Sequence, residues 1–163
     1  MRDARIRCPE CGAIVPDGFA SCNAVFNDVC AREYGDPIWG AAHLMTVDAY
    51  VLQHSSQHGP RSNAFHLMRL CRLIEHGDNP AIGRRPPRQQ GKALEKHYRS
   101  FPYLPPPSQP GSIAIVDVHG ARTPQEHIER VRSYAQSVWN AWTVHHAWAR
   151  EWATSARGHF ETG

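Results

Sequence analysis

The stretch TPQEHIERVRSYAQSVWNAWTVHHAWAREWATS, residues 123–155, decides the fold class of this 163-residue chain. Thr123 followed by Glu126 is the pattern of a helix N-terminal capping box, and Pro124 stands at the first helical position, which tolerates proline. After this start, residues suited to a buried face recur at alternating spacings of three and four. They are Ile128, Val131, Ala135, Val138, Trp142, His145, Ala149 and Trp152. The pattern predicts one long helix over 123–155 with a continuous buried stripe.

Three further helices are expected in the first half of the chain. The first is predicted over 21–34. The second, over 37–55, has Asp36 as its N-cap and Pro37 at its first helical position. The third, over 62–76, is apolar nearly all round. Helices of that kind are buried, so we expect this one to lie at the centre of the protein.

Residues 77–122 are predicted to form an irregular, proline-rich connection. The basic run RRPPR, 84–88, is expected to be a solvated loop, with binding of phosphate or an acidic partner as the alternative. A short helix is expected within 88–99. The run FPYLPPP, 101–107, is predicted to be extended, because proline cannot continue a helix. For 112–119, irregular structure or a short helix is favoured over a strand.

Composition excludes several classes of protein. A net charge of +3 is too small to argue for a nucleic-acid partner. No apolar run reaches the roughly 18 residues of a membrane span, and the N-terminus lacks the apolar core of a signal peptide. We therefore expect a cytoplasmic protein with reduced thiols and no membrane partner. The odd count of five cysteines also disfavours a disulfide framework.

The segment Cys8-Pro9-Glu10-Cys11-Gly12 is typical of one half of a zinc site. Two thiolates three positions apart, on a turn shaped by proline and glycine, can bind the same ion. Two cysteines do not complete a tetrahedral site, so the other ligands must come from elsewhere. Cys22 and the 11 histidines of the chain are the candidates.

Folding the predicted helices back on one another narrows this choice. If the first two form an antiparallel hairpin, Cys22 at the start of one lies beside His54 at the end of the other. Folding the third helix back brings His66 to the same end. The predicted zinc ligands are therefore Cys8, Cys11, Cys22 and His54, with His66 as an alternate. Four protein ligands that include thiolates make a closed, structural site.

The other two cysteines are expected to be packing residues. Cys30 lies eight residues after Cys22, which is roughly 12 Å along a helix and too far to share its metal. Cys71 lies within the apolar third helix, and a free cysteine is usually a small buried residue.

A second group of polar residues is the candidate for catalysis. His145 interrupts the stripe of the last helix, so we expect it to point inward and to meet His43 or Asp48. With His146, these residues can hold a metal ion with a bound water. The alternative is that the histidines are core residues satisfied by hydrogen bonds.

These elements predict a single all-α domain over 1–163, a four- or five-helix bundle in which 1–20 form a metal-binding loop. Three functions from different classes remain open. The first is a zinc-stapled binding module with an unknown protein or small-molecule partner. The second is a metal-dependent hydrolase or thiol transferase, and the third is a weak nucleic-acid binder acting through 84–88.

Three motifs together resemble an uncharacterised bacterial family of domains of unknown function. They are CPxCG at 8–12, VDAYxxQH at 47–54 and WxxWxxHHxxxRxW at 139–152. The resemblance spans nearly the whole chain and implies no activity. The chain differs from the family pattern at Cys30, where a leucine is usual. A more distant architectural similarity is to DinB-like metal-binding bundles, which implies a metal site between helices.

Overall fold

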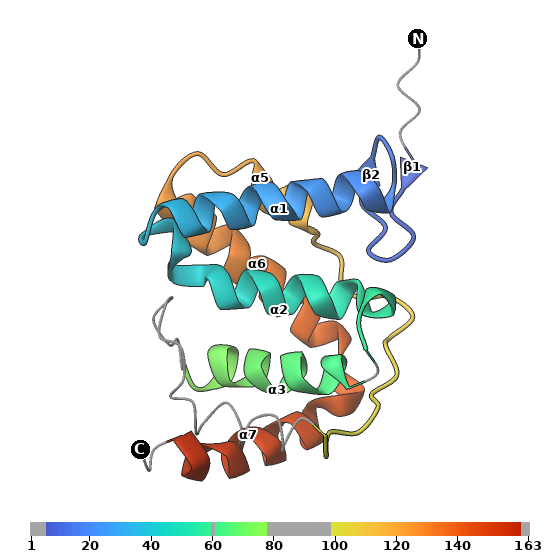
Figure 1. Cartoon of the computed structure of the whole chain (residues 1–163), viewed down its shortest axis with the longest axis vertical. Helices are drawn as coiled ribbons and strands as arrows, with labels where there is room; N and C mark the ends of the chain where they lie inside the picture. The colour runs from blue at the N-terminus through green and yellow to red at the C-terminus, as the bar shows by residue number, and fades with distance from the viewer. Residues whose placement is uncertain (1–5, 60, 78–98, 161–163) are drawn as a thin grey trace.

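The computed structural model describes residues 6–59, 61–77 and 99–160, and their backbone is mostly helical (Figure 1). In chain order the elements are β1 (Ile6–Arg7), β2 (Ile14–Val15), α1 (Phe19–Gly35), η1 (Trp39–Ala42), α2 (His43–Gln53), η2 (Ser55–Gln57), α3 (Ser62–Glu75), α5 (Ile115–His119), α6 (Pro124–Ala141), η3 (Thr143–His145) and α7 (His146–Phe160). The predicted all-α class is confirmed. Within the described ranges, the sheet content is one antiparallel pair, β1–β2.

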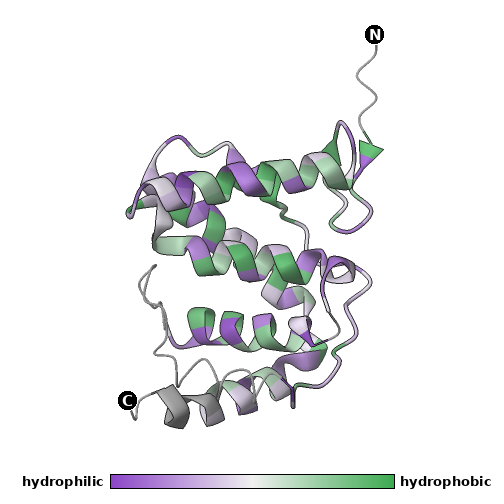
Figure 2. Cartoon of the chain, in the orientation of Figure 1, coloured by the Kyte–Doolittle hydropathy of each residue, from purple (hydrophilic) through white to green (hydrophobic). Residues whose placement is uncertain are grey.

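The helices form a stack with α6 running across it. Figure 1 shows α1, α2, α3 and α7 one below another, with α6 behind α2. α2 packs against α3 and α6, α3 packs against α7, and α1 packs mainly against α5 and η1. The largest fully buried side chains include Trp142, Tyr134, Leu52, Leu67 and Leu70. Each helix carries both hydrophobic and hydrophilic residues (Figure 2), as helices packed on one face do.

The residues predicted to cap the helices make some, but not all, of the expected hydrogen bonds. Thr123 Oγ1 accepts the Glu126 N–H at 3.2 Å, and Pro124 is the first residue of α6. The Glu126 carboxylate accepts the N–H of Arg122, one residue before the position that a capping box uses. Asp36 Oδ1 accepts the Ile38 N–H at 2.8 Å. The chain then makes the 3₁₀ turn η1, so α2 begins six residues later than predicted, at His43 rather than 37.

The prediction of one continuous helix over 123–155 is wrong. α6 ends at Ala141, and η3 separates it from α7. The Thr143 hydroxyl bonds the carbonyl of Asn140 at 2.5 Å, and such a bond competes with the helical ladder. Trp142 stays fully buried while Val144 is 80% exposed. The break redirects the chain, so that α7 packs on α3 instead of extending α6.

The described part of the connection before α6, residues 99–123, has irregular backbone outside α5. Residues 101–107 have no regular secondary structure, and Phe101 and Leu104 within them are buried. The ambiguous segment 112–119 contains the short helix α5. Residues 78–98 lie outside the described residues, with the basic run 84–88 and nearly all of the short helix expected within 88–99.

Among the helices described here, none has the combination of length and apolar composition that a membrane span requires.

Candidate metal centre

A small β-hairpin presents the first two cysteines. β1 and β2 pair antiparallel, with Ile6 opposite Val15, so residues 8–13 form the connection between them. The Cys8 N–H donates to the Ala13 carbonyl at 2.8 Å, and the Gly12 N–H donates to the Cys8 carbonyl at 2.9 Å. These bonds fold the segment into a tight turn. The segment was expected to be a loop, and strands of two residues are too short to produce a visible alternation in the sequence.

A glycine joins this hairpin to α1 and sets the position of the third cysteine. Gly18, the N-cap of α1, has φ 57°, a conformation that favours glycine. A Cβ there would lie 3.3 Å from Ile6 Cδ1, so the absence of a side chain allows the close approach to β1. The Cys22 N–H then bonds the Gly18 carbonyl at 3.1 Å. The first turn of α1 therefore carries Cys22 to the hairpin.

The fourth side chain comes from the end of α2. His54 is the C-cap of that helix, and its ring stacks on Tyr50 with centroids 4.0 Å apart. Phe19 contacts the same ring at 5.8 Å. His54 Nδ1 lies 2.8 Å from the Tyr50 carbonyl, and only a protonated nitrogen can donate to that oxygen. The lone pair of Nε2 consequently faces the cysteines, which is the usual arrangement of a histidine bound to a metal.

The donor atoms have the spacing of a tetrahedral site. The Cys11 and Cys22 sulfurs are 3.7 Å apart, and His54 Nε2 lies 3.7 Å from Cys8 Sγ and 3.4 Å from Cys22 Sγ. Zinc bonds of about 2.3 Å to sulfur and 2.0 Å to nitrogen imply S–S edges of about 3.8 Å and S–N edges of about 3.5 Å. All four donors lie within 4.8 Å of one another, and all five cysteines are free thiols. The structure thus brings together the four residues expected from the sequence.

The electrostatics of the three thiols favour a cation between them. Burial raises the pKa of Cys8, and the contact with Cys11, together with burial, raises that of Cys22. The pKa of Cys11 is lowered to about 4, chiefly by its hydrogen bond with Cys22, with His54 adding to the effect. One thiolate is therefore stabilised at the expense of its neighbours. A divalent cation removes this competition, because metal coordination favours the thiolate form of every ligand.

The cluster is closed and tied to its surroundings. Cys8, Cys22 and His54 are at most 1% exposed, while Cys11 is half-buried. Glu10, between the hairpin cysteines, accepts a hydrogen bond from the Ser56 hydroxyl in η2. This contact fixes the turn of the hairpin against the segment that follows His54.

His66, the predicted alternate zinc ligand, and two of the predicted catalytic residues, His43 and Asp48, contact other side chains than those expected. His66 Nδ1 lies 2.6 Å from Asp48 Oδ1, so His66 faces Asp48 and is not one of the four clustered donors. The buried Asp48 carboxylate also accepts three hydrogen bonds from Arg69, at 2.5, 2.8 and 3.0 Å. His43 Nδ1 instead contacts Glu33 Oε2 at 2.7 Å. His43 and Asp48 therefore belong to two separate polar clusters.

The expectation that His145 points inward to meet His43 or Asp48 is wrong. His145 is half-buried in η3, and its Nε2 contacts the Pro105 carbonyl at 2.9 Å. His146 stacks on Trp139 with centroids 3.7 Å apart and contacts the Trp139 carbonyl at 2.8 Å. The cause is the break between α6 and α7, which turns this segment out of the predicted stripe.

The polar residues of the VDAYxxQH motif each contact an element that neighbours α2. Asp48 binds α3 through the contacts above. Gln53 donates to the Ile113 carbonyl at 2.8 Å and accepts from the Tyr134 hydroxyl at 2.9 Å, which links α2 to α6 and to the segment before α5. His54 joins the cysteine cluster. The motif therefore encodes the packing of α2 as well as one candidate ligand.

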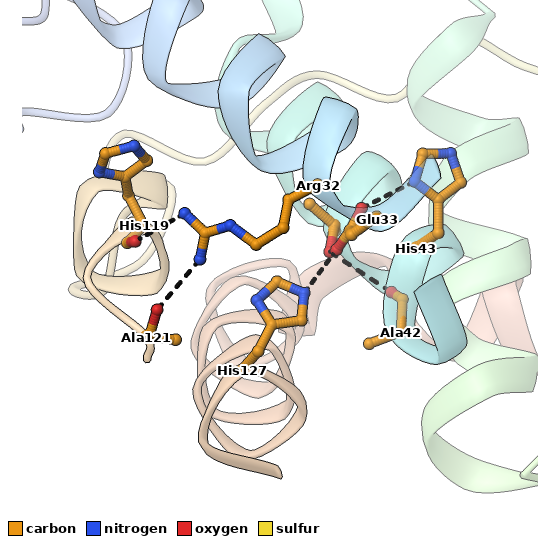
Figure 3. A network of polar contacts seen from close by, with 8 residues as sticks. Arg32, Glu33, Ala42, His43, His119, Ala121 and His127 are labelled. Atoms are coloured by element: carbon orange, nitrogen blue, oxygen red, sulfur yellow. Dashed lines mark hydrogen bonds and ion pairs between the residues drawn. The ribbon is translucent and has the colours of Figure 1, made fainter. Parts of the chain in front are cut away.

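A second polar cluster, around Glu33, contains residues that the sequence pattern did not single out. Glu33 in α1 and His127 in α6 are buried and lie 2.8 Å apart, with His43 on the other side of the carboxylate (Figure 3). Glu33 and His127 are 94 positions apart. No local spacing signals such a pair, since one residue lies in α1 and the other in α6.

The comparisons with known proteins identify a family. The model of a family of unknown function, DUF5946, matches residues 6–143, from β1 into η3. All four clustered donors lie within the match. The comparison with curated proteins finds no match, and neither does the comparison with solved structures. Because the family model covers well over half of the chain, this protein belongs to the family of unknown function DUF5946.

Proposed function

We propose that Cys8, Cys11, Cys22 and His54 bind one zinc ion, and that this zinc is structural. The observation that carries the proposal is the meeting of three sulfurs and one imidazole nitrogen within 4.8 Å. The contact distances of 3.4–3.7 Å fit the edges of a zinc tetrahedron. Four protein donors fill the coordination sphere, so no position is left for a water or a substrate.

The ion would connect parts of the chain that have few other links. The hairpin supplies two ligands, the start of α1 one and the end of α2 one. α1 itself packs mainly against α5 and η1. A metal bound here would therefore act as a cross-link that holds the hairpin and the start of α1 to the end of α2.

A closed centre supports a binding role rather than chemistry at the metal. We propose that the zinc-stapled domain acts in the cytoplasm, where thiols stay reduced, by binding a protein or a small molecule. The modest charge of +3 gives no support to a nucleic-acid partner.

The test is the metal content of protein purified under reducing conditions and then loaded with Co²⁺. Cobalt bound to three thiolates gives an intense sulfur-to-metal charge-transfer band, which reports the metal–thiolate bonds. We expect the wild type to show the band and Cys11→Ser or His54→Gln to weaken or lose it. Cys71→Ala is the matched control, because Cys71 is a buried free thiol in α3 outside the cluster. A wild type without the band would contradict the proposal.

A further inference from the structure

The far end of α1 carries a second cluster of metal-ligating side chains. Glu33 is 1% exposed, and both of its oxygens face imidazoles (Figure 3). Oε2 lies 2.7 Å from His43 Nδ1, and Oε1 lies 2.8 Å from His127 Nε2. The hydroxyl of Thr46 donates to Oε1 at 2.5 Å. Helices α1, α2 and α6 thus place one carboxylate between two imidazole nitrogens.

A thiol lies within reach of the same point. Cys30 precedes Glu33 by three positions, so the two side chains share one face of α1. The donor atoms of Cys30, Glu33 and His43 all lie within 4.8 Å of one another. An imidazole, a carboxylate and a thiol are ligand types that zinc and related divalent metals take in proteins.

The charge of this cluster is not balanced by an arginine. Arg32, the neighbour of Glu33, points the other way in Figure 3 and donates to the carbonyls of Ala121 and His119 at 3.1 and 3.2 Å. In the described part of the chain, the ion-pair contacts of Glu33 are with His43 and His127. If both rings are neutral, one negative charge is buried. A buried charge requires a partner of opposite sign, such as an imidazolium or a bound cation.

The second imidazole positions the carboxylate. His127 is fully buried, and among the described residues its Nδ1 has no hydrogen-bond partner. The ring of Trp39 covers it with centroids 5.1 Å apart. With Nδ1 unprotonated, Nε2 carries the proton and donates it to Glu33 Oε1, which also accepts the Thr46 hydroxyl. Oε1 is thus held by two donors, and Oε2 is the oxygen that faces His43.

We propose that Cys30, Glu33 and His43 bind a divalent transition-metal ion, with His127 holding the Glu33 carboxylate in place. The contact of 2.7 Å between His43 Nδ1 and Glu33 Oε2 needs to widen only to about 3 Å, the separation of neighbouring ligands on one ion. Binding requires the proton on His43 Nδ1 to move to the other ring nitrogen or to leave with the solvent, and the Cys30 thiol to lose its proton. This ion is separate from the one held by the cysteines near the hairpin.

The experiment is a Co²⁺ titration of the full chain, with equivalents bound per chain as the readout. We expect two equivalents for the wild type and one for Glu33→Gln or His43→Gln, with most of the charge-transfer band, which the three-cysteine centre supplies, retained. Cys11→Ser should give the converse, with loss of most of that band while the second ion remains. His119→Gln is the matched control, because this partly exposed histidine lies in α5 outside the cluster.

The outcomes separate the two metal centres. A wild type that binds one equivalent, with the band, overturns the second site and leaves the first intact. If both Glu33→Gln and His43→Gln fold by circular dichroism and still bind two equivalents, the second ion lies elsewhere and the proposal is wrong. Should either variant fail to fold, the wild-type stoichiometry and the neighbours of the second cobalt in X-ray absorption, expected to be nitrogen, oxygen and one sulfur, still decide the question.

Discussion

The two ends of α1 carry two buried clusters of different chemistry. Cys22 in its first turn joins three sulfurs and an imidazole, whereas Glu33 near its end joins a carboxylate and two imidazoles. In the first cluster, two ligands are three positions apart in one hairpin. In the second, Glu33 is 10 positions from His43 and 94 from His127. The first is encoded locally and is visible in the sequence, while the second exists only after the helices have packed.

The largest expected effect is the loss of thermal stability when the cysteine cluster is deprived of its metal. A chelator, or Cys11→Ser, should lower the melting temperature, because a metal bound only by the folded state stabilises it. At free zinc about 1,000 times the Kd this stabilisation is about 4 kcal/mol, which corresponds to about 8–16 °C. Thermal melts with and without chelator measure it. An unchanged melting curve for reduced, metal-loaded protein would remove the structural role assigned to the cysteine cluster.

The next effect compares two buried carboxylates. Asp48 is paired with the guanidinium of Arg69, whereas Glu33 faces imidazoles. Asp48→Asn should cost about 3 kcal/mol, because it leaves Arg69 without its charged partner. It should not change the metal content. Urea denaturation and metal analysis of the same preparation check both statements, and loss of metal from this variant would show that the clusters are not independent.

The smallest effect concerns the histidine once expected at the centre of the bundle. His145→Ala removes one contact with a backbone carbonyl and one tilted ring contact with Trp142 at a half-buried position, so it should cost less than about 1 kcal/mol. Metal content should be unchanged. Urea denaturation beside the wild type is the measurement. A loss of several kcal/mol would mean that the segment joining α6 to α7 contributes more to the fold than its contacts indicate.

The parts predicted from sequence are those that depend on local geometry. The rise of a helix and the direction of a turn suffice to bring Cys22 beside His54, because each lies near the end of its own helix. The buried stripe over 123–155 was assigned to one helix because periodicity alone cannot show a break. Trp142, at the end of α6, is still fully buried. The chain changes direction immediately after it, in the 3₁₀ turn η3.

The parts that could not be predicted depend on tertiary packing. The partners of Glu33 come from α2 and α6, and no spacing rule relates residues so far apart. His145 was assigned to the core because it falls on the helical repeat. Its actual partner, Pro105, lies in a segment without regular structure, whose path the sequence does not define.

The position of His54, one residue beyond α2, has a consequence for how metal binding and folding are coupled. Cys8, Cys11 and Cys22 lie within one short stretch of chain, so this stretch alone can offer three ligands. The fourth arrives only when the end of α2 docks, at an effective concentration set by the rest of the fold. By thermodynamic reciprocity, the factor by which docking of α2 raises the affinity for zinc is the factor by which zinc favours docking. The affinity of the centre for its metal therefore measures how firmly the end of α2 is held against the hairpin.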